Sequence, residues 1–123
     1  PRFLERKREI AARYDAALPV NAPRASWAEP SFWLYSVQVP DPEGLRLALA
    51  KEDIEARPVW TPLHKMALYA NARRIGGQVA ERLHAHGLSL PSSVGLTNAD
   101  QDRVIEIVKR VLDKQAETML ASG

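Results

Sequence analysis

The sequence of residues 55–65 is EARPVWTPLHK, and this stretch decides how the rest of the chain is interpreted. Its two prolines fix their own φ angles and favour an extended conformation at the residue before each. The stretch therefore predicts a short strand that continues into a stiff loop and carries Trp60 outward. His64 and Lys65 follow directly, so the loop would present a ring, a titratable donor and a cation to an anionic ligand. The alternative is structural, with Trp60 as a core anchor and His64 as an ordinary surface histidine.

The composition is that of an ordinary globular chain. Hydrophobic residues make up 46% and charged residues 26% of the 123 residues, which suits a single domain over residues 1–123. The absence of cysteine excludes disulfides, thiolate metal sites and a cysteine nucleophile, and no apolar run is long enough to span a bilayer. These features fit a cytoplasmic location. The net charge is only +2 although the pI is near 9.2, which is weak support for nucleic-acid binding.

Hydrophobic periodicity predicts elements in the order helix, strand, helix, strand, helix, strand, helix. The helices are expected at residues 3–18, 42–51, 77–86 and 98–119, and the strands at 31–39, from about 55, and at 88–90. We expect the strand at 31–39 to lie centrally in the sheet, because its first half is apolar on both faces. The predicted fold class is α+β, a small β-sheet flanked by helices.

Local signals mark several helix ends. Asp41 and Pro42 are typical of an N-cap followed by the first helical residue. Asp53 stands where a left-handed residue, usually glycine, would close the second helix. Thr97 and Asp100 predict a capping box at the start of the last helix, with aspartate in place of the usual glutamate.

The first predicted helix carries a run of basic residues, namely Arg2, Arg6, Lys7, Arg8 and Arg13. This run is the basis of an alternative function, a stand-alone basic interaction or nucleic-acid-binding module whose affinity for DNA would fall steeply with salt. We favour a solvated helix face, because no aromatic residue interleaves with the charges as in single-strand binders.

Internal chemistry offers no catalytic residues. The sequence has no hydrolase serine motif, paired carboxylates, metal-ligating cluster or phosphate-binding loop, so we predict no catalytic residue and no metal ligand in this chain. His84 and His86 are two apart and would project from different sides of a helix, which disfavours a shared metal. Any of the five lysines could in principle form a Schiff base, but none has a context that suggests burial and activation.

Motifs along nearly the whole chain occur in one characteristic order. They are RPVWTPLH at 57–64, GQVAERL at 77–83, GLSLPSS at 87–93 and Leu96-Thr97, together with the helix at 6–18, the strand at 32–37 and the helix at 100–109. In this order they resemble the DegT/DnrJ family of pyridoxal-phosphate (PLP)-dependent sugar aminotransferases. Within that family the chain is most similar to enzymes that aminate a 4-keto nucleotide-linked hexose.

The resemblance implies that residues 1–123 are the C-terminal small domain of a fold-type I aminotransferase. The large PLP-binding domain, which carries the Schiff-base lysine in this family, is absent, so the chain alone is expected to be inactive and to bind no PLP. A domain separated from its partner should expose an apolar patch, to which Phe3, Trp60 or residues 66–69 are expected to contribute.

For the full-length parent, the resemblance implies transfer of an amino group, typically from glutamate, to a keto nucleotide-sugar in surface-polysaccharide or amino-sugar biosynthesis. The parent would be a cytoplasmic homodimer that binds no nucleic acid and has no membrane span. Dehydration or another PLP-dependent reaction on the same fold stays open.

The same resemblance implies a substrate-binding role for five residues: Trp60, His64, Lys65, Ser92 and Ser93. His64 would donate a hydrogen bond, and Lys65 would place a charge near the diphosphate. Ser92 and Ser93, with Pro91 before them, would approach the hexose. For each of these residues the alternative is a packing role, because lining residues vary among proteins that share a fold.

Overall fold

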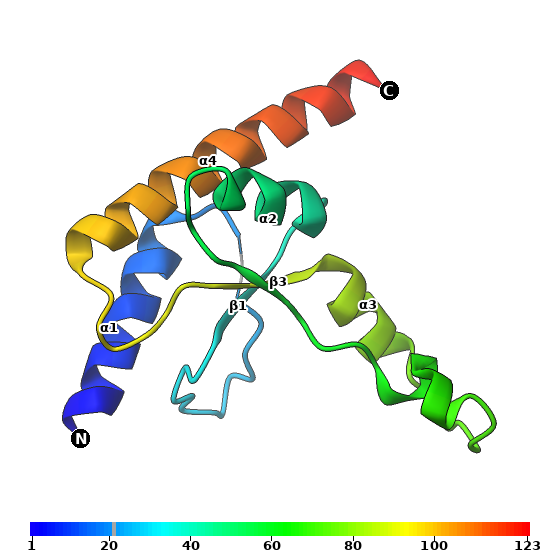
Figure 1. Cartoon of the computed structure of the whole chain (residues 1–123). Coiled ribbons are helices and arrows are strands. Elements are labelled where there is room, and N and C mark those ends of the chain that lie inside the picture. The colour runs from blue at the N-terminus through cyan, green and yellow to red at the C-terminus, as the bar shows by residue number, and fades with distance from the viewer. Residues whose placement is uncertain (21) are drawn as a thin grey trace.

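The computed structural model describes residues 1–20 and 22–123. Within these residues the chain forms four α-helices, three strands and two short 3-10 helices (Figure 1). In chain order they are α1 (Arg2–Ala17), β1 (Tyr35–Gln38), α2 (Pro42–Ala50), β2 (Arg57–Pro58), η1 (Leu63–Lys65), η2 (Ala67–Tyr69), α3 (Gln78–His86), β3 (Gly87–Leu90) and α4 (Asn98–Ala121). The order and type of the elements confirm the predicted α+β class and all seven predicted helices and strands.

The sheet is antiparallel, with strand order β1-β3-β2. The prediction that the strand at 31–39 is central is therefore wrong: β1 is an edge strand, and β3 lies in the middle with all four residues buried. The physical reason lies just before β1, where Phe32 has a φ of 51° and interrupts the extended backbone. The apolar residues at 32–34 lie outside the sheet, so their two-sided apolar pattern does not report a central strand.

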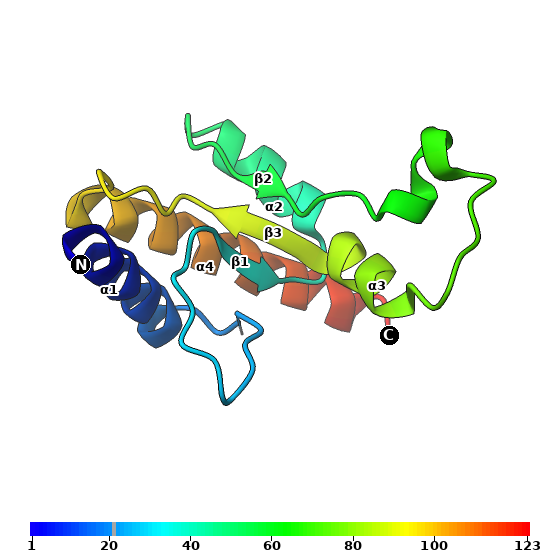
Figure 2. The same cartoon turned by 90° about the horizontal axis from the view of Figure 1, so that it is seen from below.

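The hydrophobic core lies between the sheet and three helices. Helix α4 runs along the back of the strands, packed against α2, with α1 beside its N-terminal half (Figure 2). Tyr35 and Val37 of β1 pair with Leu90 and Leu88 of β3, and all four side chains are buried. Ser36 and Ser89 pair on the opposite face, where their hydroxyl oxygens lie 2.8 Å apart. The sheet thus has an apolar face towards the helices and a polar face away from them.

The predicted N-caps are present, but the Asp100 carboxylate accepts a hydrogen bond from the Thr97 hydroxyl at 2.6 Å instead of from the Thr97 backbone N–H that a full capping box would use. The Asp41 carboxylate accepts a hydrogen bond from the Gly44 N–H at 2.9 Å, and the Thr97 hydroxyl accepts one from the Asp100 N–H at 3.0 Å. Asp53 closes the second helix with a φ of 58°, the left-handed conformation predicted for it. These caps fix the ends of α2 and the start of α4, two of the helices that pack on the apolar face of the sheet.

Residues 61–86 form an arm that extends away from the core. The arm contains η1, η2 and α3, and none of the residues in these three elements is buried. It projects from the sheet at the lower right in Figure 1, opposite the end of the molecule where α1 begins. No helix within residues 1–20 and 22–123 is both long and apolar enough to cross a membrane.

Candidate functional site

An open cleft of about 670 Å3 borders β3 and the turn that follows it. Ser92 and Ser93 line this cleft together with Lys7, Trp33 and Arg57. Ser92 is buried, and its hydroxyl accepts a hydrogen bond from the Tyr35 N–H at 3.3 Å. Ser93 is exposed, and its hydroxyl makes no hydrogen bond to a described residue. Of the two predicted serines, Ser93 therefore has the hydroxyl available to a ligand, while Ser92 supports the wall of the cleft.

Lys7 ties the first helix to both sides of the cleft. Its ammonium donates to the Trp33 carbonyl at 3.0 Å and to the Ser92 carbonyl at 2.5 Å. Lys7 is partly buried, and burial lowers its pKa. Its nitrogen is already engaged by two carbonyl oxygens, however, and a Schiff-base lysine needs an unengaged amine. Lys7 acts as a clamp in this structure.

Trp33 and Trp60 stack on each other at the edge of the cleft. Their ring centroids are 5.9 Å apart with an interplanar angle of 29°, and the two side chains are 70% and 69% exposed. The alternative that Trp60 anchors the core is therefore wrong. Trp33 also lines the cleft, and Trp60 directly precedes the arm, so the pair lies between the cleft and the start of the arm at residue 61.

On the arm, the carboxylate of Glu81 contacts three basic side chains. Glu81 Oε1 lies 2.7 Å from His64 Nε2 and 2.6 Å from an Arg74 guanidinium nitrogen, and Glu81 Oε2 lies 3.9 Å from Lys65 Nζ. The hydrogen bond from His64 is the main cause of the lowered pKa of Glu81, and the charges of Arg74 and Lys65 lower that pKa further. Because Lys65 and Arg74 together carry two positive charges against one carboxylate, the group has a net positive charge even when His64 is neutral.

The three basic side chains of this group differ in how accessible they are. The side chains of Lys65 and Arg74 are 50% and 45% exposed, whereas that of His64 is 21% exposed. The His64 ring also packs against Gly77, where an added Cβ would lie 2.7 Å from Cε1. His64 is thus held between Glu81 and Gly77, and the accessible charges for an anionic ligand belong to Lys65 and Arg74.

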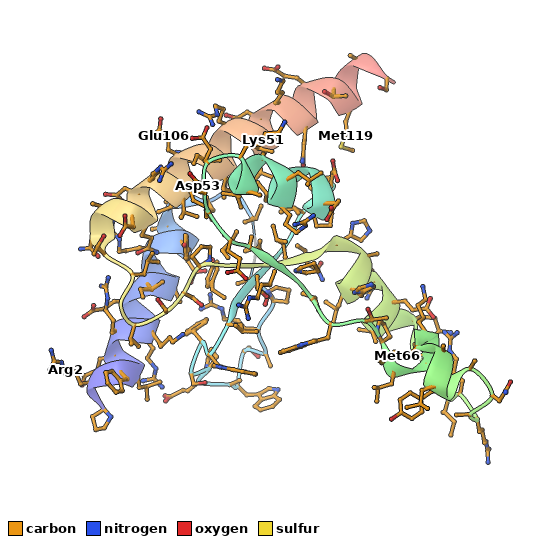
Figure 3. The ribbon with its side chains drawn as sticks, in the orientation of Figure 1. Arg2, Lys51, Asp53, Met66, Glu106 and Met119 are labelled. Carbon is orange, nitrogen blue, oxygen red and sulfur yellow. The ribbon has the colours of Figure 1, made fainter. Side chains whose placement is uncertain are left out.

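Four of the five predicted site residues fall into two groups, Ser92 and Ser93 at the cleft and His64 and Lys65 on the arm. The fifth, Trp60, belongs to the Trp33–Trp60 pair between these groups. Figure 3 shows this spread: Asp53, which lines the cleft, lies beside the end of α2, whereas Met66 lies out on the arm. Sequence reasoning missed Trp33, because its strand-like pattern indicated packing. It also missed Arg74 and Glu81, because no local spacing relates residue 64 to a partner 17 positions later.

The histidines of α3 do not share a ligand site. His84 Nδ1 donates to the Val59 carbonyl at 2.7 Å and so braces the backbone next to Trp60. Among the residues that the structure describes, no group of three or more side chains is arranged to hold a metal ion.

The basic residues of α1 are largely engaged within the chain. Arg6 donates to the Leu96 carbonyl at 2.6 Å, and Arg13 pairs with Asp102 at 2.5 Å. Arg8 approaches Glu29 at 3.5 Å. These contacts attach α1 to the start of α4 and to the loop before β1. They favour a structural role for this face over the nucleic-acid-binding alternative.

Large apolar side chains are exposed where the sequence predicted them. Phe3, Trp60 and Leu68 are 71%, 69% and 82% exposed, and Met66 and Tyr69 are also exposed.

Among the described residues Lys7 alone combines a lysine amine with partial burial in the cleft, and its amine is engaged. The described residues therefore offer no free, partly buried lysine amine for a Schiff base with PLP.

The fold and site define a small α+β domain with a polar cleft on one side of a stacked tryptophan pair and a cationic arm on the other. Residues 1–109 match the DegT/DnrJ/EryC1/StrS aminotransferase family. The chain belongs to this family, as the sequence motifs predicted.

Individual relatives agree with this assignment. GDP-perosamine synthase of Caulobacter vibrioides is 41% identical over 88 residues, which cover 66% of this chain and 23% of that protein. EpsN of Bacillus subtilis, named as a candidate pyridoxal phosphate-dependent aminotransferase, is 33% identical over 117 residues, covering 85% of this chain and 30% of EpsN. The crystal structure of a DegT/DnrJ/EryC1/StrS aminotransferase from Brucella abortus is 30% identical and superimposes with a TM-score of 0.80 over 89% of this chain and 31% of its own.

The chain thus spans between 23% and 31% of the length of these relatives. This partial coverage is consistent with the interpretation of the chain as the C-terminal part of a sugar aminotransferase.

Proposed function

We propose that residues 1–123 form the C-terminal small domain of a PLP-dependent aminotransferase that aminates a nucleotide-linked 4-keto hexose. The amino group would come from glutamate, and the product would serve surface-polysaccharide or amino-sugar biosynthesis. The enzyme would work in the cytoplasm as a homodimer. The observation that carries the proposal is that a chain of this family has a polar cleft and, on the other side of the Trp33–Trp60 pair, a cationic arm, because a nucleotide-sugar pairs a hexose with a diphosphate.

Different residues of the chain would contact different parts of the ligand. Lys65 would face the diphosphate, and Arg74 would share that role because it is similarly exposed and contacts the same carboxylate. His64 would hold the arm in place through its Nε2 contact with Glu81, so the predicted hydrogen bond from His64 to the ligand would have to come from Nδ1. Ser93 would contact the hexose, supported by Ser92 in the wall behind it.

PLP would supply the electron sink that allows nitrogen to move between donor and sugar. Its lysine and its pyridine partner would lie outside these residues, since Lys7 is engaged as a clamp. The contribution of this domain is to bind and orient the sugar and to close one side of the cleft against water. The chain alone should therefore show no transamination.

The test is an assay of the full-length protein with PLP, glutamate and a panel of nucleotide-linked 4-keto hexoses. We expect 2-oxoglutarate and an amino-sugar in equal amounts, identified by mass spectrometry. The same nucleotide-sugars without the keto group are the control, and they should give neither product. Failure to aminate any keto sugar in the panel, with glutamate or another amino acid as donor, would contradict the proposal.

A further inference from the structure

Side chains of helix α1 hold the turn that follows β3. Three backbone carbonyls within residues 91–96 accept hydrogen bonds from this helix: Pro91 from the Tyr14 hydroxyl at 2.8 Å, Ser92 from the Lys7 ammonium at 2.5 Å and Leu96 from the Arg6 guanidinium at 2.6 Å. Lys7 and Tyr14 are two helical turns apart and therefore lie on the same face of α1. They reach successive carbonyls of the turn from this face.

The attachment of α1 to the core does not require these polar contacts. Ile10 and Ala11 of α1 are already buried in the hydrophobic core. The contact from Lys7 also carries a cost, because partial burial of the ammonium lowers its pKa and disfavours its charged form. The turn is thus restrained at several points by donors that the packing of the helix does not demand.

Ser93 lies within this restrained segment. Its own carbonyl accepts a hydrogen bond from the Leu96 N–H at 3.0 Å, and the carbonyl and hydroxyl of Ser92 before it are both engaged. The Ser93 side chain, in contrast, is exposed and lines the cleft. A hydroxyl carried by restrained backbone is preorganised, so a ligand loses little affinity to ordering it.

We propose that Lys7 and Tyr14 are positioning residues for sugar binding, which fix the carbonyls of Ser92 and Pro91 and so hold the Ser93 hydroxyl where it contacts the hexose. This inference rests on the proposed function, in which Ser93 contacts the hexose. Lys7 and Tyr14 act through Ser93, and neither has to touch the ligand.

Tyr14→Phe is the most selective variant for the test. It removes only the hydroxyl that holds the Pro91 carbonyl, and it keeps a fully buried ring that stacks on Tyr35. Lys7→Met removes the ammonium and keeps an unbranched side chain. Circular dichroism checks the fold of each variant, and Tyr14→Phe decides the outcome alone if Lys7→Met does not fold.

The measurement is titration calorimetry on the full-length protein with two ligands. One is a nucleoside diphosphate-hexose, and the other is the same nucleoside diphosphate without the sugar. We expect Ser93→Ala to weaken binding of the sugar-containing ligand about fivefold, the usual effect of one hydrogen bond between neutral groups. Tyr14→Phe and Lys7→Met should each weaken it about two- to fivefold, since they act through the same bond. The affinity for the nucleoside diphosphate should not change.

Tyr35→Phe is the matched control for Tyr14→Phe. Tyr35 is also buried and belongs to the same ring stack, but its hydroxyl donates to Asp15 at 2.8 Å and not to the turn. Arg8→Met is the control for Lys7→Met, because Arg8 is the next residue of α1 and approaches Glu29 instead. Both controls should bind both ligands with wild-type affinity.

A double-substitution cycle separates positioning from a general loss of structure. When residue 93 is already alanine, Tyr14→Phe and Lys7→Met should change the affinity for the sugar-containing ligand by less than about twofold. Residues that act independently of Ser93 would instead weaken binding by the same factor in both backgrounds.

Each result bears on the proposal. It is overturned by equal weakening in the two backgrounds, by wild-type affinity of Ser93→Ala or Tyr14→Phe for the sugar-containing ligand, or by a loss in Tyr35→Phe as large as that in Tyr14→Phe. Because the titration needs no turnover, the outcome is independent of the aminotransferase assay. Sugar-selective weakening that depends on Ser93, in a protein that aminates no keto sugar, would support the positioning and overturn the proposed function. Amination together with wild-type binding in Tyr14→Phe would do the reverse.

Discussion

The core and the arm of this domain are stabilised in different ways. In the core, α1, α2, α4 and the sheet bury a continuous set of apolar side chains, including Ile10, Leu45 and Val108 with no exposed surface. In the arm, η1, η2 and α3 bury no residue, and one carboxylate and a left-handed glycine hold the segment together. The core should therefore set the stability of the domain, and the arm should be able to move without unfolding it.

The largest expected effect comes from the core. Leu45→Ala removes a fully buried side chain of α2 and leaves a cavity, which should lower the free energy of unfolding by about 2–5 kcal/mol. Leu68→Ala on the arm is the control, because Leu68 is 82% exposed and its loss should change that free energy by less than about 0.5 kcal/mol. Urea denaturation followed by circular dichroism measures both. Equal losses would show that the arm is part of the cooperative unit.

A second substitution probes the junction where the arm returns to the core. Gly87 has a φ of −87°, which any residue can adopt, but an added Cβ would collide with the Leu83 carbonyl and lie 2.5 Å from Val59 Cγ2. Since the backbone carbonyl cannot move alone, Gly87→Ala should lower the free energy of unfolding by about 1–3 kcal/mol.

Gly95→Ala provides a matched glycine control, because nothing lies within 4 Å of its added Cβ. It should be neutral or slightly stabilising in the same denaturation experiment. A loss from Gly95→Ala as large as that from Gly87→Ala would mean that close approach is not the reason for glycine at the junction.

The core was largely predictable from sequence, because its elements follow rules that act over a few residues. The apolar spacing in α1 and α4 gave these helices correctly, and the caps at Asp41 and Thr97 gave the starts of α2 and α4. The other predicted ends of these three helices differ from the structure by one or two residues. The order of the strands was not predictable in this way. The central position depends on which strands pair, and the residues around Phe32 have a two-sided apolar pattern without belonging to the sheet.

The arrangement of the candidate site was predictable only in part. The motif at 57–64 and the serines at 92 and 93 drew attention to the right segments. The stack of Trp33 on Trp60 and the contact of His64 with Glu81 depend on how distant segments meet in space. No periodicity or local spacing encodes such contacts, and the roles of these residues in binding stay predictions.

A third substitution separates the arm from the core more sharply. Gly77 has a φ of 103° and contacts the His64 ring, so Gly77→Ala would suffer both backbone strain and a collision. The strain alone costs about 1–2 kcal/mol, and we expect it to appear as faster hydrogen exchange within the arm. Amides of β3 and α4 should keep their protection. Uniformly faster exchange across the domain would instead indicate that the arm and the core unfold together.

The smallest expected effect on stability, and the one most specific to the arm, comes from Glu81→Gln. The wild-type Glu81 has a lowered pKa, so its carboxylate stabilises the arm fully at pH values above the ordinary glutamate pKa. This contribution is lost as the pH falls through the lowered pKa of the folded state, when protonation removes the charge that His64, Arg74 and Lys65 share. Hydrogen exchange of the arm in the wild type should therefore accelerate on acidification, relative to the intrinsic rate of the same segment. In Glu81→Gln that ratio should be raised already at neutral pH and should change little as the pH falls, because glutamine does not titrate. A wild-type ratio that stays constant through the acidic range would show that the shared carboxylate does not hold the arm.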